Sequence, residues 1–99
     1  MAMKYNVTFL PEANRNLLDI DEYLSRFYPS TAAKFFTKLD KKLLLLQEQP
    51  YIGAKYIPNQ KYRRLVVDDY LAFYSIYEEK HEILIHRILH SSMDITRHL

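Results

Sequence analysis

Apolar residues recur at intervals of three and four along the first half of the chain. One series is Leu10, Ala13, Leu17, Ile20, Leu24 and Phe27, and a second is Ala33, Phe36, Leu39 or Asp40, Leu43 and Leu46. This spacing puts each series on one face of an α-helix. Pro29 separates the two helices, and Ser30 or Thr31 is expected to cap the second. The pattern predicts an antiparallel helical hairpin.

Alternating and β-branched segments flank this hairpin. Residues 3–10 alternate between apolar and polar side chains, which predicts a strand that ends at Pro11. Three further strands are predicted over residues 62–67, 70–77 and 82–89, with turns at Asp68-Asp69 and at residues 78–81. Residues 70–77 are apolar on both faces, which is typical of a strand in the middle of a sheet.

Helices followed by strands predict an α+β fold. At 99 residues the chain is one domain, residues 1–99. We expect an N-terminal strand and an antiparallel helical hairpin packed on one face of a small antiparallel sheet. The stripes Leu17–Ile20–Leu24 and Phe36–Leu39–Leu43 should face the sheet, and residues 91–99 should form a short C-terminal helix or tail.

Composition narrows the classes of protein. The formal net charge of +2 permits contact with nucleic acid or an acidic partner without requiring it. Absence of cysteine excludes disulfides and thiolate sites. No signal peptide or membrane-length apolar run is recognisable, so a cytoplasmic protein without membrane contact is expected. Nine Tyr and five Phe exceed what a small core hides, which indicates an interface. Its candidate residues are Tyr23, Tyr28, Tyr62, Phe73 and Tyr77.

Standard catalytic signatures are missing from the sequence. One glycine cannot form a phosphate-binding loop, and the histidines lack a carboxylate or cysteine set, so neither a metal nor a cofactor is expected. A basic set remains: Lys55, Lys61, Arg63, Arg64, Arg87, His90, Arg97 and His98. Arg and Lys can hold a phosphodiester while a histidine transfers protons. The alternative is a solvated sheet edge or a partner-binding surface, which is favoured for Arg63 and Arg64.

The order of these segments resembles a known family. The carrying residues are Tyr-Arg-Arg-Leu-Val-Val at 62–67, Asp-Tyr-Leu-Ala-Phe-Tyr-Ser-Ile-Tyr at 69–77 and Ile-His-Arg-Ile-Leu-His-Ser-Ser-Met-Asp-Ile at 85–95. Together with the preceding strand and hairpin they look like the RelE/ParE superfamily of toxins from type II toxin–antitoxin modules. The resemblance implies a growth inhibitor neutralised by a cognate antitoxin. It also implies that operator DNA is contacted only through the antitoxin.

The resemblance leaves the activity open. RelE-type members cleave mRNA in the ribosomal A site, whereas ParE-type members poison DNA gyrase and lack the nuclease residues. The nucleases usually carry an arginine after the tyrosine of the central strand, and here Leu71 follows Tyr70. A Leu71–Phe73 patch suits a protein contact better than a phosphate, which favours the ParE-like reading. Antitoxin contacts are expected at Arg63, Arg64, Phe73 and Tyr77.

Two alternatives remain. The first is a ribosome-dependent nuclease with Arg64, Arg87 and His90 as catalytic residues and Lys55 and Lys61 on the RNA backbone. The second is an inert relative that binds a partner and regulates its own operon. Whether the protein is an enzyme therefore stays open at this point, as does the choice between DNA gyrase and the ribosome as target.

Overall fold

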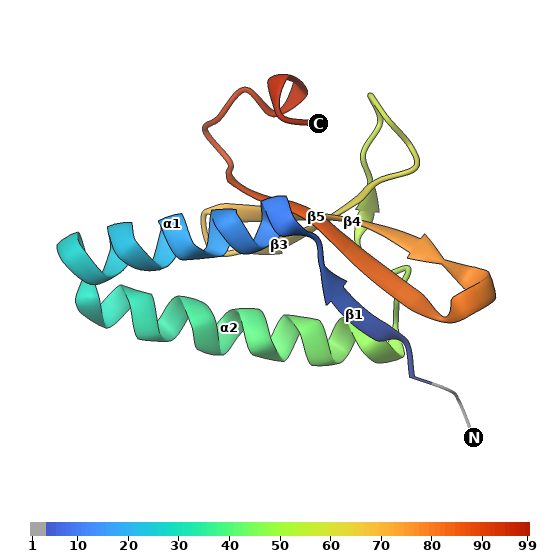
Figure 1. Ribbon diagram of the computed structural model, residues 1–99, viewed down its shortest axis with the longest axis horizontal. Helices are drawn as coiled ribbons and strands as arrows, with labels where there is room; N and C mark the ends of the chain where they lie inside the picture. Colours follow the sequence, from blue (N-terminus) through green and yellow to red (C-terminus); the bar gives the residue numbers. More distant parts are fainter. Residues whose placement is uncertain (1–3) are drawn as a thin grey trace.

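The computed structural model describes residues 4–99; of the first predicted strand, residue 3 lies outside this range. The elements in chain order are β1 (Asn6–Phe9), α1 (Pro11–Phe27), α2 (Pro29–Glu48), β2 (Ala54–Lys55), β3 (Arg63–Val67), β4 (Tyr70–Tyr77), the 3₁₀ turn Glu78–Lys80, β5 (Glu82–His90) and the 3₁₀ turn Ile95–Arg97 (Figure 1). The predicted α+β fold is confirmed. The C-terminal segment is a tail with one 3₁₀ turn.

The strands form one five-stranded sheet in the order β1-β5-β4-β3-β2. β4 lies at its centre, as the apolar character of both its faces predicts. The neighbours β5, β4, β3 and β2 pair antiparallel, whereas β1 runs parallel to β5. No tight turn joins β1 to β5, so their directions are not restricted to the antiparallel arrangement of a hairpin. The sheet is therefore mixed.

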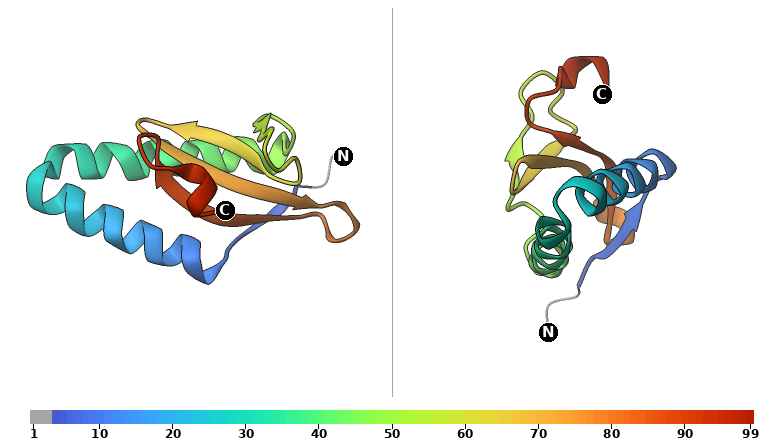
Figure 2. Two further views of the ribbon diagram at one scale, coloured as in Figure 1. Left: turned by 90° about the horizontal axis from the view of Figure 1, so that it is seen from above. Right: turned by 90° about the vertical axis from the view of Figure 1, so that its left-hand side faces the viewer.

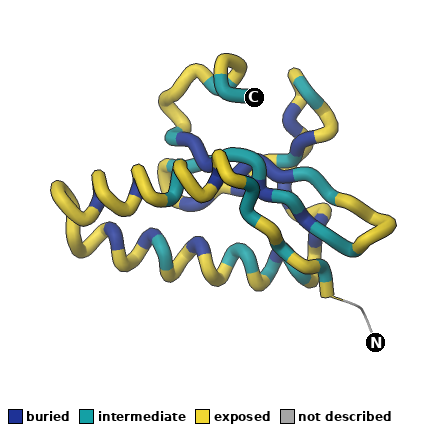
Figure 3. The backbone as a smooth tube through the Cα atoms, in the orientation of Figure 1, coloured by how far each residue is buried: buried dark blue, intermediate teal, exposed yellow. Residues whose placement is uncertain are grey.

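Both helices cover one face of the sheet, with α1 against β5 and α2 against β3 (Figure 2). The buried residues of α1 are Ala13, Ile20 and Leu24, which fall on the predicted stripe. Phe27 closes that stripe in the sequence but is 58% exposed at the tip of the hairpin. The alternation of buried and exposed turns along both helices is visible in Figure 3.

The buried face of α2 begins one residue earlier than predicted. Its buried residues are Ala32, Phe35, Leu39 and Leu46, whereas Ala33 is exposed and Phe36 is only partly buried. The sequence contains the doublets Ala32-Ala33 and Phe35-Phe36, so its periodicity fits either register. Phe35 is the one that enters the core, where its ring contacts the rings of Phe36 and Tyr70 at centroid distances of 5.1 Å each.

The junction between the helices is tighter than expected. The Tyr28 N–H donates to the Leu24 carbonyl at the end of α1, and the Tyr28 carbonyl accepts from the N–H groups of Thr31 and Ala32 at the start of α2. Pro29 is the first residue of α2, a position where its missing N–H costs nothing. The expected side-chain cap at Ser30 or Thr31 is therefore wrong, since both residues already lie inside the helix.

The other face of the sheet carries a second, smaller apolar cluster. Its buried members are Tyr56, Tyr62, Phe73 and Leu89, and Leu71, Ile95 and Leu99 pack against them. The segment between β2 and β3 and the C-terminal tail thus cover this face (Figure 1). Within the described residues, no helix is long and apolar enough to cross a membrane.

Candidate functional site

An irregularity in β5 determines where its basic residues lie. Phe73 pairs with Arg87 while the next residue of β4, Tyr74, pairs with Ile85, so His86 is an extra residue on β5. Such a bulge changes the direction of the side chains that follow it. Here it brings His86 and Arg87 together at the face opposite the helices, beside Tyr62, His98 and Leu99.

His86 is held in a neutral, hydrogen-bonded environment. Its Nε2 lies 2.7 Å from the Ser75 hydroxyl, and its ring contacts the Tyr62 ring edge-on at 4.8 Å. Burial, and secondarily the charge of Lys61, lowers the pKa of His86. A lowered pKa keeps the imidazole uncharged near neutral pH, so His86 is a poor contact for a phosphate.

Arg87 is bound by neighbouring side chains of this chain. Its Nη1 donates to a Glu12 carboxylate oxygen at 3.4 Å, and its Nη2 donates to Nδ1 of His98 at 3.4 Å. The guanidinium Nε is buried without a partner in the described structure. Arg87 therefore connects α1, β5 and the C-terminal tail, and Glu12 offsets its charge. A groove of about 400 Å³ lies beside it.

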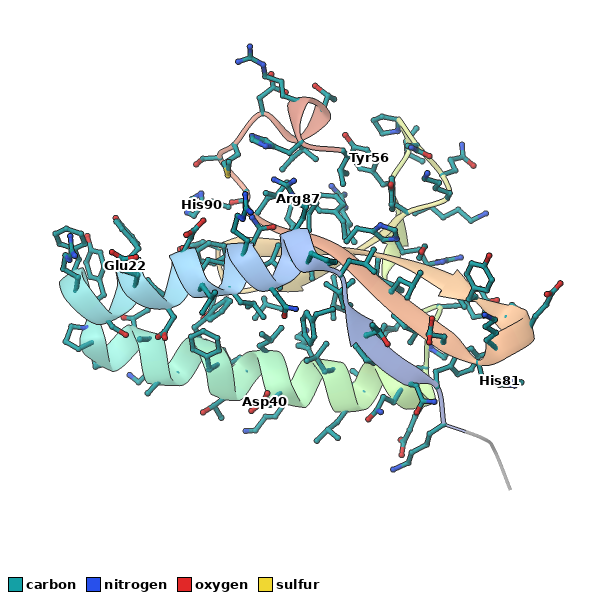
Figure 4. All side chains as sticks on the ribbon, viewed as in Figure 1. Glu22, Asp40, Tyr56, His81, Arg87 and His90 are labelled. Atoms are coloured by element: carbon teal, nitrogen blue, oxygen red, sulfur yellow. The ribbon has the colours of Figure 1, made fainter. Side chains whose placement is uncertain are left out.

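His90 lies on the opposite face of β5 from Arg87. It pairs with Tyr70, whose ring it contacts edge-on at 5.2 Å, while Arg87 pairs with Phe73. His90 Nδ1 accepts from the Ser92 N–H at 3.1 Å and lies 2.6 Å from the Ser92 hydroxyl. No hydrogen bond joins Arg87 and His90 in the described part of the chain, and they occupy separate points along β5 (Figure 4).

Among the remaining basic candidates, Arg63 has a structural role. Its guanidinium donates to the carbonyls of Gly53 at 2.7 Å and Tyr51 at 3.2 Å, and it lies over the Tyr51 ring. Arg64 is exposed and pairs with Ala54 of β2 on one side and Phe73 on the other. Arg64 and Arg87 thus share a row across the sheet, with the buried Phe73 between them.

The two lysines do not converge on His90. Lys55 is exposed on β2, opposite Arg63. Lys61 lies in the segment before β3, with its ammonium 5.0 Å from the centre of the Tyr62 ring. The structure therefore brings the predicted nuclease residues together only in part. Arg87 and His90 line one groove of about 500 Å³ beside α1, whereas Arg64, Lys55 and Lys61 do not line it.

Phe73 is fully buried and contacts the Tyr56 ring edge-on at 5.4 Å. The residue 56–62 segment and the C-terminal tail cover Phe73, so this structure does not expose it for the direct antitoxin contact that the sequence suggested. Tyr62 is also buried, and Leu71 packs on the same cluster. Of the other aromatic candidates, Tyr23, Tyr28 and Tyr77 are each about half exposed, at 50%, 53% and 51%.

Sequence reasoning missed one groove. It has a volume of about 590 Å³ and lies between the hairpin tip and the β3–β4 turn, lined by Tyr23, Tyr28, Phe35, Asp68, Asp69, Tyr70 and His90 among others. Burial, with the nearby Tyr23 and Asp69, raises the pKa of Tyr70. The large number of tyrosines in the sequence indicated an aromatic surface. The sequence alone could not show that Tyr23, Tyr28 and Tyr70 lie beside Asp68 and Asp69, because the fold brings these residues together. Within residues 4–99, no three His, Asp or Glu side chains gather as a metal site.

The fold is that of a small α+β protein, with two helices on one face of a five-stranded mixed sheet. The family described as "ParE toxin of type II toxin-antitoxin system, parDE" matches residues 7–95, and the chain therefore belongs to this family. No curated protein sequence shows a significant match.

Two solved structures share the fold. One is a chain of the chromosomal ParDE toxin–antitoxin system from P. aeruginosa, with a TM-score of 0.70 and 20% identity, covering 90% of this chain and 98% of that one. The other is a chain of the toxin–antitoxin complex RelBE2 from Mycobacterium tuberculosis, with a TM-score of 0.65 and 20% identity, covering 89% of this chain and 99% of that one. At this identity they support the fold alone.

Proposed function

We propose that this protein is a growth-inhibiting toxin that acts on its target by protein contact and is neutralised by an antitoxin. Membership of the ParE family supports this function, and both similar structures come from toxin–antitoxin systems. One observation carries the choice of a non-hydrolytic mechanism. Leu71 stands where the nucleases of the superfamily usually have arginine, and it packs in an apolar cluster with Phe73 and Leu89.

The arrangement of cations is poorly suited to RNA cleavage. General acid–base chemistry requires a proton donor within hydrogen-bond reach of the phosphodiester and cations that stabilise the developing charge. Arg87 and His90 line one groove, but Arg87 is already bound to Glu12 and His98, and His90 lies on the other face of β5 with its Nδ1 bonded to Ser92. The Leu71 side chain itself offers a phosphate neither a charge nor a hydrogen-bond donor. These contacts favour the ParE-like activity, with DNA gyrase as the proposed target.

The proposed antitoxin contacts follow from exposure. Arg64 is exposed on the face of the sheet, and Tyr77 is half exposed at the end of β4. The guanidinium of Arg63 already donates to backbone carbonyls. Arg63 is therefore proposed to hold the adjoining segment in place for the antitoxin and not to offer it a free charge. At the hairpin tip, the rings of Phe27 and Tyr28 lie 5.2 and 6.1 Å from that of Tyr23, which gives an exposed aromatic surface suited to burial by a partner.

The test is induced expression in a bacterial host, followed by separate assays of gyrase-dependent DNA supercoiling and ribosome-dependent mRNA cleavage. We expect growth arrest and impaired supercoiling without cleavage at codons in the A site. The variant His90→Ala should retain toxicity, because the proposed mechanism needs no proton transfer at that residue. His81→Ala, in the β4–β5 turn, is the matched control.

Two outcomes would contradict the proposal. Wild-type mRNA cleavage that falls by roughly 10²–10⁴ in His90→Ala, the usual cost of losing a general acid–base group, would establish the nuclease instead. Absence of any growth effect, with antitoxin binding intact, would establish the inert partner-binding relative.

A further inference from the structure

The groove of about 590 Å³ at the hairpin tip has aromatic walls. Tyr23 and Tyr28 line it from the helical hairpin, and their ring centroids lie 6.1 Å apart. Tyr70 lines it from the start of β4, where edge-on contacts with Phe35 at 5.1 Å and His90 at 5.2 Å hold its ring in place. Because Tyr23 and Tyr28 are half exposed, the faces of their rings are available to a ligand.

The β3–β4 turn adds two carboxylates to this groove. Asp68 forms an ion pair with Lys38, with Nζ 2.7 Å from the carboxylate oxygen. Asp69 is exposed and forms no ion pair within residues 4–99. The Asp69 carbonyl accepts from the Ser91 N–H at 2.8 Å, which fixes the turn against the end of β5. The turn therefore presents one uncompensated carboxylate, that of Asp69, at a fixed position.

The groove carries negative charge although the chain is positive overall. The formal net charge is +2, with 14 Lys and Arg residues against 12 Asp and Glu. In the described part of the chain, however, no Lys or Arg side chain lines the groove. Burial raises the pKa of Tyr70, and the nearby Tyr23 and Asp69 raise it further, because a second negative charge is disfavoured there. A cation in the groove would meet a carboxylate and tyrosine rings together.

An arginine guanidinium fits this combination better than other cations. It is planar and stacks on aromatic faces, while its N–H groups can donate to a carboxylate in a bidentate pair. An ammonium group is compact and strongly hydrated, and it forms no planar stack. A volume of about 590 Å³ accommodates the side chain together with the neighbouring part of a protein surface. Tyrosine and arginine are also the residues that carry much of the binding energy in protein interfaces.

We propose that this groove binds an arginine side chain on the surface of the toxin's target. The guanidinium lies against the rings of Tyr23 and Tyr70 and donates to the Asp69 carboxylate. The inference rests on the proposed function, because that function requires the target to be contacted as a protein. It assigns the hairpin tip, at one end of the long axis of the molecule (Figure 1), to the target. Tyr77, a proposed antitoxin contact, lies at the opposite end of β4 from Tyr70.

The first experiment titrates the purified toxin with N-acetyl-arginine amide and follows its NMR signals. Saturable shifts are expected for the rings of Tyr23, Tyr28 and Tyr70 and for the Asp69 amide, but not for Tyr77. N-acetyl-citrulline amide has nearly the same shape without the charge and should bind at least about tenfold more weakly. Equal binding of the two compounds, or no shift in the groove, would overturn the proposal. Tetramethylammonium that binds as tightly as the arginine compound would overturn the guanidinium as the ligand.

Two variants separate the carboxylate from the aromatic wall. Asp69→Asn removes the charge with a residue that suits a turn, and it should weaken binding of N-acetyl-arginine amide by about tenfold. Asp40→Asn makes the same change on α2, outside the groove (Figure 4), and should have no effect. Tyr23→Leu should weaken binding by about two- to fivefold, whereas Tyr77→Leu should not. Equal losses in the two aspartate variants would indicate general charge attraction and overturn the groove.

Growth inhibition separates this inference from the proposed function. Asp69→Asn should need about tenfold more protein than the wild type or Asp40→Asn to halve the growth rate. It should still fold, as checked by circular dichroism, and still co-purify with the product of the adjacent gene.

Three outcomes would contradict the target as the occupant. Unchanged growth arrest by Asp69→Asn, with arginine binding lost, would overturn it and leave the toxin function standing. Retained toxicity with loss of the adjacent product would make the antitoxin the occupant instead. Absence of growth arrest by the wild type would refute the proposed function and the target with it, while the titration still decides whether the groove binds arginine.

Discussion

Tyr74 fixes the segment that follows α2. Its side chain is fully buried, and its hydroxyl donates to the Pro50 carbonyl at 2.8 Å and accepts from the Gly53 N–H at 2.9 Å. Burial raises the pKa of Tyr74, so the hydroxyl keeps its proton and can serve as donor. Gly53 allows this approach, because a Cβ there would lie 2.5 Å from the Tyr74 hydroxyl oxygen. The only glycine of the chain is thus needed for close packing.

We expect Tyr74→Phe to lower the free energy of unfolding by about 1–3 kcal/mol, since a buried N–H and a buried carbonyl lose their partner. Tyr77→Phe, on the same strand but half exposed, is the control and should change stability little. Urea denaturation of both variants measures the difference. Equal midpoints for Tyr74→Phe and the wild type would mean that water or a rearranged loop satisfies these groups.

His86 predicts the direction of a pH effect. Its pKa is lowered in the folded protein, so between the folded and unfolded pKa values the unfolded chain binds more protons. The stability from neutral His86 is complete above the unfolded pKa of about 6.5 and declines as pH falls toward the folded value. His86→Gln can keep a hydrogen bond to Ser75 without titrating. In this variant the urea midpoint should therefore change less with pH between about pH 7 and pH 5 than in the wild type.

His81→Gln is the control for this measurement, since that residue lies in the β4–β5 turn. Glu78 affects a lower pH range, because hydrogen bonds from Tyr51 and Tyr5 hold the pKa of its carboxyl below the usual value. The same pH dependence in His86→Gln and the wild type would show that another group causes it.

The periodicity of the sequence predicted most helices and strands. It predicted the wrong buried face where either of two neighbouring apolar residues could have entered the core. In the α1 stripe, Ala13 and Ile20 have polar neighbours on both sides, and Ile20 and Leu24 are buried as predicted. In α2 the doublet Phe35-Phe36 allowed two registers, and only packing against Tyr70 of the sheet selects Phe35. The extra residue in β5 and the parallel pairing of β1 left no local signal, because both depend on contacts between distant segments.

A pair of phenylalanine substitutions tests the register of α2. Phe35→Ala removes a fully buried side chain and should cost about 3–5 kcal/mol of unfolding free energy. Phe36→Ala removes the adjacent, partly buried ring and should cost clearly less. Denaturation midpoints of the two variants give the comparison directly. A larger loss for Phe36→Ala would restore the register that the sequence pattern suggested.

At the scale of the whole molecule, the sequence identified the family but could not place its site residues together. Arg87 meets Glu12 from the start of α1 and His98 from the tail, and no motif records these contacts. The sequence suggested that the aromatic residues of β4 form an exposed patch. Phe73 is instead covered by two other segments, residues 56–62 before β3 and the C-terminal tail after β5. The sheet consequently has one apolar cluster on each face. The helices cover the first cluster, and the residue 56–62 segment and the C-terminal tail cover the second.

The tail-covered cluster should be the weaker of the two. Ile95 and Leu99 are its contacts from the tail, and both are only partly buried. The double variant Ile95→Ala/Leu99→Ala should therefore lower the free energy of unfolding by about 1–3 kcal/mol, since each change removes part of one apolar side chain's burial. It should also increase binding of a hydrophobic dye as Leu71 and Leu89 become exposed, while the helical circular dichroism stays unchanged. Met93→Ala/Thr96→Ala, at exposed positions of the same segment, is the control and should have neither effect. Unaltered stability and dye binding in Ile95→Ala/Leu99→Ala would mean that the residue 56–62 segment closes this face without help from the tail.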